Sequence, residues 1–364
     1  MDFYSTNSLS WDKLEYGTDA IQNLHYGLIH VGLPTMIDLS KDKLPNITNG
    51  NTPKNYELCQ EGDIAFADAS EDTNEVAKAV EFYKLKGKDV ICGLHTIHGR
   101  DNHQKTVVGY KGYAFSSTAF HHQIRRIAQG TKIYSINSKN FSECYIGIPS
   151  KEEQKKIATL LRLMDERIVT QNKIIEDLKK LKYAISHILF SSKFTNHLSY
   201  IANVVMGQSP SSNAYNDQGI GMPLVQGNLD ISNGKTTPRL YTSEFNQTAE
   251  EGNIILTVRA PVGEVAKATK NVCLGRGVCA IIPHEENMSD FIYQYLTFYK
   301  FMWRKYEQGS TFTSINGSDV RNILCPEVRN VSILTLLDSK ISTEERVVKL
   351  YQKQKQYLLR QMFI

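Results

Sequence analysis

The sequence contains two long segments that repeat one pattern of apolar residues. In residues 157–190 the apolar side chains stand at alternating steps of three and four, with Gln171 and Lys182 as interruptions. The same pattern returns 173 positions later, and there the interruptions are Glu344 and Lys355. A 3.5-residue period over about four heptads is the spacing of a coiled coil. The pattern therefore predicts two copies of one long helix, each with a single apolar seam.

The repeat extends beyond the helices. Glu75–Ala79 recurs letter for letter as Glu264–Ala268, and Gln129–Thr131 is matched by Gln308–Ser310. Such self-similarity indicates a duplicated unit that consists of one globular domain and one helix.

The segments outside the two helices have mixed α+β character, with glycine and asparagine between short apolar runs. Expected strands are Asp89–Leu94, Thr106–Val108, Asn253–Val258 and Val278–Ile282, and expected short helices are Phe120–Ala128 and Asp290–Tyr306. The predicted fold class is α+β, with an internal repeat and two globular domains that alternate with two long helices. The predicted boundaries are 1–148 for the first domain, 149–191 for the central helix, 192–326 for the second domain and 327–364 for the C-terminal helix.

The first long helix has a defined start, because Ser150 and Glu153 have the spacing of a capping box. The second helix follows Cys325-Pro326 and lacks such a box. The two copies differ at their openings as well. Leu198–Val204 precedes the second copy, whereas almost nothing precedes Ser5 in the first. We therefore expect the first copy to lack an opening strand, so that the true start lies upstream or residues after Phe190 complete the domain.

Composition and motifs exclude several function classes. No apolar run approaches the roughly 18 residues of a membrane span, and the N-terminus has no secretory signal pattern. The 6 cysteines form no Cys-x-x-Cys pair, which is typical of reduced thiols in a cytoplasmic protein. The chain has no complete P-loop, no Pro-Pro and no His-Glu-x-x-His, so we expect no catalytic residue, metal site or bound cofactor on it.

Several motifs in their duplicated order resemble the specificity subunit of type I restriction-modification systems. They are Ile148–Ala158 and Leu163–Ile168 in the central helix, and Gly207–Pro210, Gln226-Gly227 and Gln308–Thr311 in the second domain. The resemblance covers essentially the whole chain. It implies two target-recognition domains that each read one half of a split site in double-stranded DNA.

The resemblance also implies how the helices and the partners are arranged. The two helices would form an antiparallel coiled coil with pseudo-twofold symmetry, which sets the separation of the domains and binds two methyltransferase subunits. The chain itself would be non-catalytic. S-adenosylmethionine, ATP and Mg²⁺ would be bound by those methyltransferase subunits and by the restriction subunits of a complete complex.

Candidate contact residues follow from this interpretation. Base edges and phosphates are contacted by Arg, Lys, Asn, Gln and small hydroxyl side chains. The candidates for DNA binding are Arg100, Asn102, His103 and Lys105 in the polar loop expected from His98 to Lys105, Arg125 after a short helix, Gln208, Ser209 and Gln226 near turns, Arg259 at a strand end, Arg276, and Ser310 and Thr311 in a loop suited to phosphate. Arg276 stands between Gly275 and Gly277, which would permit a close backbone approach. The candidates for the helix spacer and the methyltransferase contact are Gln154, Leu161, Met164, Ile168, Ile175, Leu178, Leu334, Leu337, Ile341, Val348 and Leu358.

Two other functions stay open at this level. The formal net charge is +4, but residues 1–150 carry more acidic than basic side chains, and residues 191–326 carry equal numbers. DNA binding must therefore rest on local patches. A coiled-coil adaptor that binds only proteins, or an enzyme with an unrecognised site, would fit the same charge balance.

Overall fold

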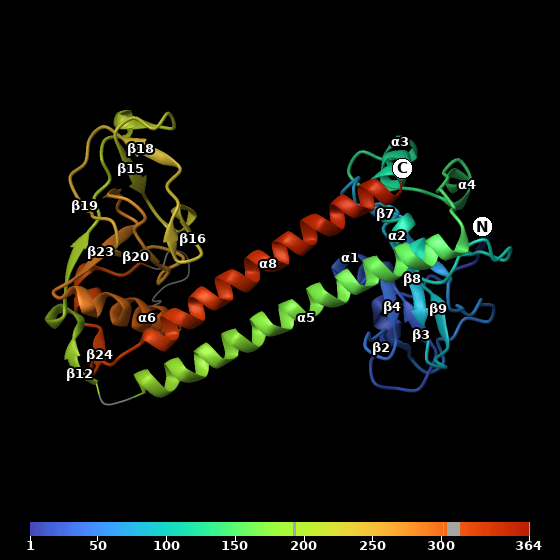
Figure 1. Cartoon of the computed structure of the whole chain (residues 1–364), viewed down its shortest axis with the longest axis horizontal. Coiled ribbons are helices and arrows are strands. Elements are labelled where there is room, and N and C mark those ends of the chain that lie inside the picture. The colour runs from blue at the N-terminus through green and yellow to red at the C-terminus, as the bar shows by residue number, and fades with distance from the viewer. Residues whose placement is uncertain (192–193, 301, 304–313, 364) are drawn as a thin grey trace. The chain divides into compact units, whose positions relative to one another are not determined.

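The computed structural model describes residues 1–191, 194–300, 302–303 and 314–363. The chain divides into two compact units, of which unit 1 contains residues 1–172 and 347–364 and unit 2 contains residues 173–346. Each unit therefore combines one α+β domain with a part of each long helix (Figure 1).

Unit 1 is built on two sheets. The first has the order β1-β10-β6-β8-β4, and the second has the order β2-β5-β3-β9. The strand bounds are β1 Asp2–Tyr4, β2 Leu14–Glu15, β3 Gln22–Leu24, β4 Met36–Asp38, β5 Asn46–Ile47, β6 Ile64–Ala67, β8 Ala79–Lys84, β9 Val90–Cys92 and β10 Thr96–Arg100. A separate pair joins β7 Ala69–Ser70 to β11 Tyr134–Ser135. The short helices are α1 Tyr26–Val31, α2 Tyr110–Ala114, α3 Thr118–Ile127 and α4 Ser138–Phe141.

Unit 2 is also built on two main sheets, with the orders β13-β23-β20-β21-β17-β16 and β14-β18-β15-β22-β19. The strand bounds are β13 Ala202–Met206, β14 Tyr215–Asn216, β15 Met222–Val225, β16 Ile231–Ser232, β17 Lys235–Thr236, β18 Leu240–Thr242, β19 Thr248–Ala249, β20 Ile254–Thr257, β21 Val265–Lys267, β22 Val272–Leu274 and β23 Val278–Pro283. A further pair joins β12 Phe194–His197 to β24 Leu324–Pro326. The short helices are α6 Ser289–Tyr299 and α7 Gly317–Arg321. The pair β15 and β22 is parallel, as is the pair β3 and β9 of unit 1.

The two long helices are α5 Lys151–Phe190 and α8 Ser332–Met362 (Figure 1). With 40 residues and a rise of 1.5 Å per residue, α5 is about 60 Å long. The Ser150 hydroxyl accepts a hydrogen bond from the Glu153 amide at 3.3 Å, which is one half of the expected capping box. The start of α8 is capped instead by Asn330, whose side-chain oxygen accepts from the Ser332 amide at 2.8 Å.

The ends of the helices share hydrophobic cores with the domains. In unit 1, Leu161 of α5 and Phe363, which follows α8, pack with Tyr110 and Tyr113 of α2. In unit 2, Phe190 of α5 and Leu334 of α8 belong to the core that contains Phe291 and Tyr295 of α6. Burying these large side chains against the domains stabilises the helix ends, which is where a long helix otherwise frays.

Three expectations differ from the structure. The opening strand that the first copy was expected to lack is present as β1, since Asp2–Tyr4 pairs antiparallel with β10. Thr106–Val108 is not a strand, because side chains rather than a neighbouring strand bind its amides. The polar loop expected from His98 begins later, since β10 extends to Arg100. Among the described residues, no helix combines the length and the apolar character needed to cross a membrane.

Candidate nucleic-acid interface

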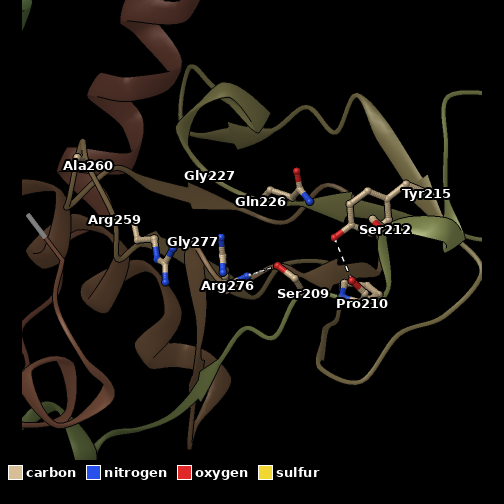
Figure 2. Close-up of a pocket in the computed structure, with 10 residues that line it drawn as sticks. All are labelled: Ser209, Pro210, Ser212, Tyr215, Gln226, Gly227, Arg259, Ala260, Arg276 and Gly277. Atoms are coloured by element: carbon tan, nitrogen blue, oxygen red, sulfur yellow. Dashed lines mark hydrogen bonds between the residues drawn. The ribbon is translucent and has the colours of Figure 1, made fainter. Parts of the chain in front are cut away.

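A cavity of about 570 Å³ in unit 2 brings together four of the predicted DNA-binding residues (Figure 2). These are Ser209, which follows β13, Gln226, which follows β15, Arg259, which follows β20, and Arg276, which precedes β23. They are separated by up to 67 positions in sequence. Strand pairing brings them together, because β15 pairs with β22 and β23 pairs with both β13 and β20.

Glycines allow the segments around this cavity to approach one another closely. A Cβ atom on Gly277 would lie 2.1 Å from the Gln226 carbonyl oxygen, and one on Gly207 would lie 2.2 Å from the Gly275 carbonyl oxygen. Neither arrangement is possible for a larger residue without a backbone shift. The expectation that the glycines beside Arg276 permit a close backbone approach is confirmed.

The cavity is positively charged. Among the described residues, its lining contains Arg259 and Arg276 and no acidic residue. Both arginines are exposed, and in the part of the chain that the structure describes neither guanidinium forms an ion pair. A guanidinium presents a planar set of donors that matches a phosphate or the edge of guanine in a bidentate manner. The cavity can therefore hold an anionic, hydrogen-bonding ligand.

Neighbouring contacts hold the cavity in shape. The Ser209 hydroxyl accepts a hydrogen bond from the Arg276 amide at 3.3 Å, and the Tyr215 hydroxyl donates to the Pro210 carbonyl oxygen at 3.3 Å (Figure 2). The Gln226 amide donates to the buried carboxylate of Asp230 at 2.8 Å. These contacts fix the backbone segments that carry Gln226 and Arg276, so both side chains start from fixed positions at the cavity.

Sequence reasoning missed part of the lining and included residues that lie elsewhere. Pro210, Ser212, Tyr215, Gly227, Ala260 and Gly277 line the cavity and were not among the candidates. Gly227 and Gly277 directly follow the candidates Gln226 and Arg276, so their place at the site could have been predicted from these dipeptides. Nothing in the sequence pointed to Tyr215. Gln208 is exposed next to the cavity but is not part of its lining. Ser310 and Thr311 lie outside the described residues.

The predicted residues of unit 1 are not gathered in one place. His103 and Lys105 line a cavity of about 460 Å³ together with Asp101 and several aromatic residues. Asn102 donates hydrogen bonds to the Asp2 carboxylate and the Tyr4 hydroxyl, both at 2.8 Å. This contact holds the middle of the loop against the N-terminal strand.

Arg100 is largely buried, whereas Arg125 is exposed, and the guanidinium groups of both have hydrogen-bond partners. Arg100 lies in β10, and its guanidinium donates to Asp63 at 2.7 Å and to Glu57 at 2.6 Å, with a side chain only 11% exposed. A direct DNA contact by Arg100 would require breaking these ion pairs. Arg125 lies apart on α3, where it donates to the Asn74 side-chain oxygen at 2.7 Å.

Loop 101–106, which carries His103 and Lys105, is held from two sides. The Asp101 carboxylate accepts from both the amide and the hydroxyl of Thr106 at 2.7 Å. Gln154 of α5 accepts from the Val107 amide at 2.8 Å and donates to the Lys105 carbonyl oxygen at 3.1 Å. The Gln154 side chain is 0% exposed, so the expected contact with a partner subunit is corrected to an internal contact that fixes this loop.

The other seam candidates on α5 and α8 are all buried or half-buried. Polar pairs flank the seam in each unit. In unit 1 the Lys355 ammonium donates to Asp165 at 2.5 Å, and Tyr113 donates to the same carboxylate at 2.8 Å. In unit 2, Lys182 donates to Asp338 at 2.6 Å, and Gln294 of α6 donates to that carboxylate at 2.7 Å. In each unit, α5 and α8 are therefore bound to one another beside a domain residue that shares the aspartate.

Comparisons with known proteins identify the family. The profile of the type I restriction modification DNA specificity domain matches this chain twice, over residues 43–180 and 195–347. A specificity subunit of the type I restriction enzyme MjaX from Methanocaldococcus jannaschii is 30% identical over 288 residues, which are 73% of this chain and 67% of that protein.

Two solved structures share the fold at low sequence identity. One, from work on complex assembly and conformational transition of the type I R-M system, has a TM-score of 0.59 and 21% identity over 89% of each chain. The type I restriction-modification S subunit from M. genitalium has a TM-score of 0.59 and 18% identity over 100% of this chain and 93% of that chain. Since the two domain matches together span most of the sequence, the chain belongs to the family of type I restriction-modification DNA specificity subunits.

Proposed function

We propose that this specificity subunit reads one half of a split DNA site with the cavity of unit 2, and that Arg259 and Arg276 are its principal DNA contacts. The observation that carries this proposal is the pair of exposed guanidinium groups that have no carboxylate partner within the described part of the chain, in a cavity that also holds Gln226. Arginine at guanine and glutamine at adenine are the commonest side chains for reading bases in the major groove. Ser209 and Gln208 stand beside them as candidate phosphate contacts.

The second half-site belongs to unit 1 in this proposal. Its exposed candidates are His103, Lys105, Asn102 and Arg125, the last two with the partners described above, and Arg100 remains a prediction with its ion pairs. Support comes from loop 101–106, which is held by Asp101 and Gln154 and is therefore preorganised. A surface that is already ordered loses less conformational entropy when it binds.

The helices act as the spacer between the half-sites. We infer an antiparallel coiled coil with pseudo-twofold symmetry, in which the chain is organised as domain 1–148, helix 149–191, domain 192–326 and helix 327–364. The ion pairs support this inference. Asp338 lies 173 positions after Asp165, and Lys355 lies 173 positions after Lys182. Exchanging the two copies therefore converts the Lys355–Asp165 pair into the Lys182–Asp338 pair. The similar strand orders of the two units are further support. At 3.4 Å per base pair, a spacer of tens of ångströms suits half-sites about one helical turn apart.

The members of this family are not catalytic, and the enzymatic activities belong to the methyltransferase and restriction subunits of the complex. We propose that two methyltransferase subunits bind this chain in the cytoplasm. S-adenosylmethionine, ATP and Mg²⁺ are held by the methyltransferase and restriction subunits in this proposal. Exposed apolar residues on α5, among them Leu163, Val169 and Leu181, lie outside the buried seam and are candidates for that contact. The relatives offer no support for an adaptor that binds only proteins.

DNA binding by Arg259 and Arg276 is tested with the intact complex. Sequencing of methylated sites in the host would give the target, and fluorescence anisotropy would compare target and scrambled duplexes over a range of salt concentrations. If the arginine reads a base, Arg276→Ala or Arg259→Ala should weaken target binding by about 1–3 kcal/mol and relax specificity at one position. If the arginine binds a phosphate, the same variant should weaken binding to all sequences and lower the salt slope by about one.

The matched control is Arg329→Ala, which removes an exposed arginine outside the cavity. If Arg259→Ala and Arg276→Ala bound target and scrambled DNA as the unchanged protein does at every salt concentration, the cavity would not be the DNA-binding site.

The spacer proposal is tested by shortening both helices. Removal of one heptad between Ile168 and Leu189, with the matching heptad of α8, keeps the seam in register. We expect the distance between the recognised half-sites to change, or recognition to be abolished, in a methylation-site assay. Normal binding with an unchanged spacing would refute the role of the helices as a ruler.

A further inference from the structure

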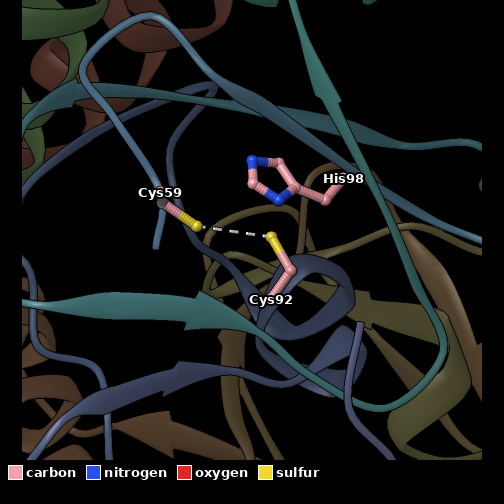
Figure 3. A group of neighbouring side chains, drawn as sticks. All are labelled: Cys59, Cys92 and His98. Carbon is pink, nitrogen blue, oxygen red and sulfur yellow. Dashed lines mark hydrogen bonds between the residues drawn. The ribbon is translucent and has the colours of Figure 1, made fainter. Parts of the chain in front are cut away.

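Three residues in the core of unit 1 bring soft metal-ligand atoms together, although they are far apart in sequence. Cys59, Cys92 and His98 each offer one ligand atom, and these atoms lie within 4.8 Å of one another (Figure 3). Their exposed fractions are 5%, 2% and 0%. The distance between the two sulfur atoms is 3.6 Å, too long for a disulfide bond, which measures about 2.0 Å.

The imidazole of His98 is oriented by its second nitrogen. Its Nε2 atom is 2.8 Å from the Asp63 carboxylate, and the side chain of Asp63 is only 2% exposed. Its Nδ1 atom is buried and has no hydrogen-bond partner among the residues that the structure describes. In Figure 3 the ring nitrogen next to the attachment point of the side chain faces the sulfur atoms. A histidine that binds a metal with one nitrogen and a carboxylate with the other is the usual arrangement in metal sites.

The carboxylate that orients His98 is itself fixed. Asp63 accepts hydrogen bonds from Arg100 at 2.7 Å and from the Gln60 amide at 2.8 Å. Because the Nε2 atom of His98 lies at hydrogen-bond distance from this carboxylate, the imidazole carries its proton on Nε2 and leaves the Nδ1 lone pair free.

The sulfur separation agrees with one ion bound by both cysteines. Two Zn–S bonds of about 2.3 Å at a tetrahedral angle place the sulfur atoms about 3.8 Å apart. Charge favours a divalent ion, because two thiolates, a neutral imidazole and Zn²⁺ sum to zero and a buried net charge would be costly.

We propose that Cys59, Cys92 and His98 bind a single thiophilic divalent metal ion, with Zn²⁺ the best match. Three protein atoms would leave the fourth tetrahedral position to a water molecule or a small anion. The role is structural: Cys92 ends β9, His98 lies in β10, and Cys59 lies in the segment joined to β9 by a hydrogen bond from its amide to the Val90 carbonyl oxygen at 2.8 Å. The ion would tie together three segments that lead to loop 101–106.

Metal content of the full-length chain tests the proposal. The chain would be produced without a histidine tag in medium supplied with Zn²⁺, and its zinc content measured by elemental mass spectrometry. We expect about one zinc per chain in the unchanged protein. Cys92→Ser and His98→Asn should lower this content several-fold, whereas Cys273→Ser, which removes an equally buried thiol of unit 2, should leave it unchanged.

A second measurement does not depend on the folding of the variants. Co²⁺ added to the metal-free, unchanged chain should produce a thiolate-to-cobalt absorption band in the near ultraviolet, and Zn²⁺ should raise its melting temperature. The proposal would be overturned by a folded chain that holds no zinc and gives no cobalt band, by zinc content unaffected in Cys92→Ser, or by a Cys59–Cys92 disulfide in the protein isolated from cells.

Discussion

The contact between Gln154 and loop 101–106 makes the sharpest prediction about this protein. Methionine at position 154 nearly conserves the volume of the buried side chain but removes all of its hydrogen bonds. Gln154→Met would therefore leave the core filled and release the loop. The partners that lose a hydrogen bond are the Val107 amide and the carbonyl oxygens of Lys105 and Pro149.

The size of the effect follows from these three bonds. Each contributes a net of about 0.5–1.5 kcal/mol, and a buried donor left without an acceptor costs about 1–3 kcal/mol. We therefore expect a local destabilisation of about 2–3 kcal/mol, which is confined to the loop and the first turns of α5.

Amide hydrogen exchange measures this destabilisation locally, which matters because a chain with two compact units need not unfold in one step. At about 1.4 kcal/mol per factor of ten, the Val107 amide should exchange about 30–150 times faster in Gln154→Met. The control is Gln352→Met, which changes an exposed glutamine of α8 in the same unit.

The DNA-binding assay gives the functional consequence. Gln154→Met should weaken recognition of the half-site assigned to unit 1 more than recognition of the other half-site. Val107 protection equal to that of Gln352→Met would refute the reasoning, because the hydrogen bonds would then not hold the loop.

Three further predictions concern the cavity, the helices and the loop. Gly277→Ala should cost about 1–3 kcal/mol and weaken DNA binding, whereas Gly227→Ala, whose Cβ meets no atom within 4 Å, should leave the melting temperature unchanged. Lys182→Asp should lower the melting temperature, because it places two carboxylates together. The double variant Lys182→Asp, Asp338→Lys should restore the melting temperature. Because the pair is partly exposed, we expect a coupling energy between the two substitutions of about 0.5–1 kcal/mol. Although burial opposes it, hydrogen bonding to Thr106 lowers the pKa of the Asp101 carboxyl, so its stabilisation is present above about pH 4 and disappears as the pH falls through the lowered pKa. Exchange of the Thr106 amide followed against pH would measure this change, and Asp101→Asn should remove the pH dependence.

The parts of the fold that depend on local periodicity could be predicted from the sequence. The central helix was expected over residues 149–191 and extends over Lys151–Phe190. Asn253–Val258 contains β20, Val278–Ile282 lies within β23, and Phe120–Ala128 largely coincides with α3. Apolar spacing and glycine positions are properties of short stretches, so a single sequence contains them.

Side-chain partners from distant segments could not be predicted. Arg100 pairs with Asp63 across 37 positions, and Gln154 binds Val107 across 47 positions. Both pairs depend on which strands are neighbours and on how α5 packs against the domain. The residue spacing within one segment predicts neither of these. This is why an arginine expected at the DNA is found in an ion pair, and a glutamine expected at a partner is found in the core.

The duplicated apolar seam and the ordered motifs, among them Ile148–Ala158 and Gly207–Pro210, allowed the sequence by itself to indicate two α+β domains, two long helices and the family to which they belong. Only the tertiary structure decided which polar residues meet. It gathered Gln226, Arg259 and Arg276 around one cavity, and it brought Cys59 and Cys92 to 3.6 Å without a Cys-x-x-Cys motif. The physical reason is that elements form from neighbours along the chain, whereas sites form from neighbours across paired strands and packed helices.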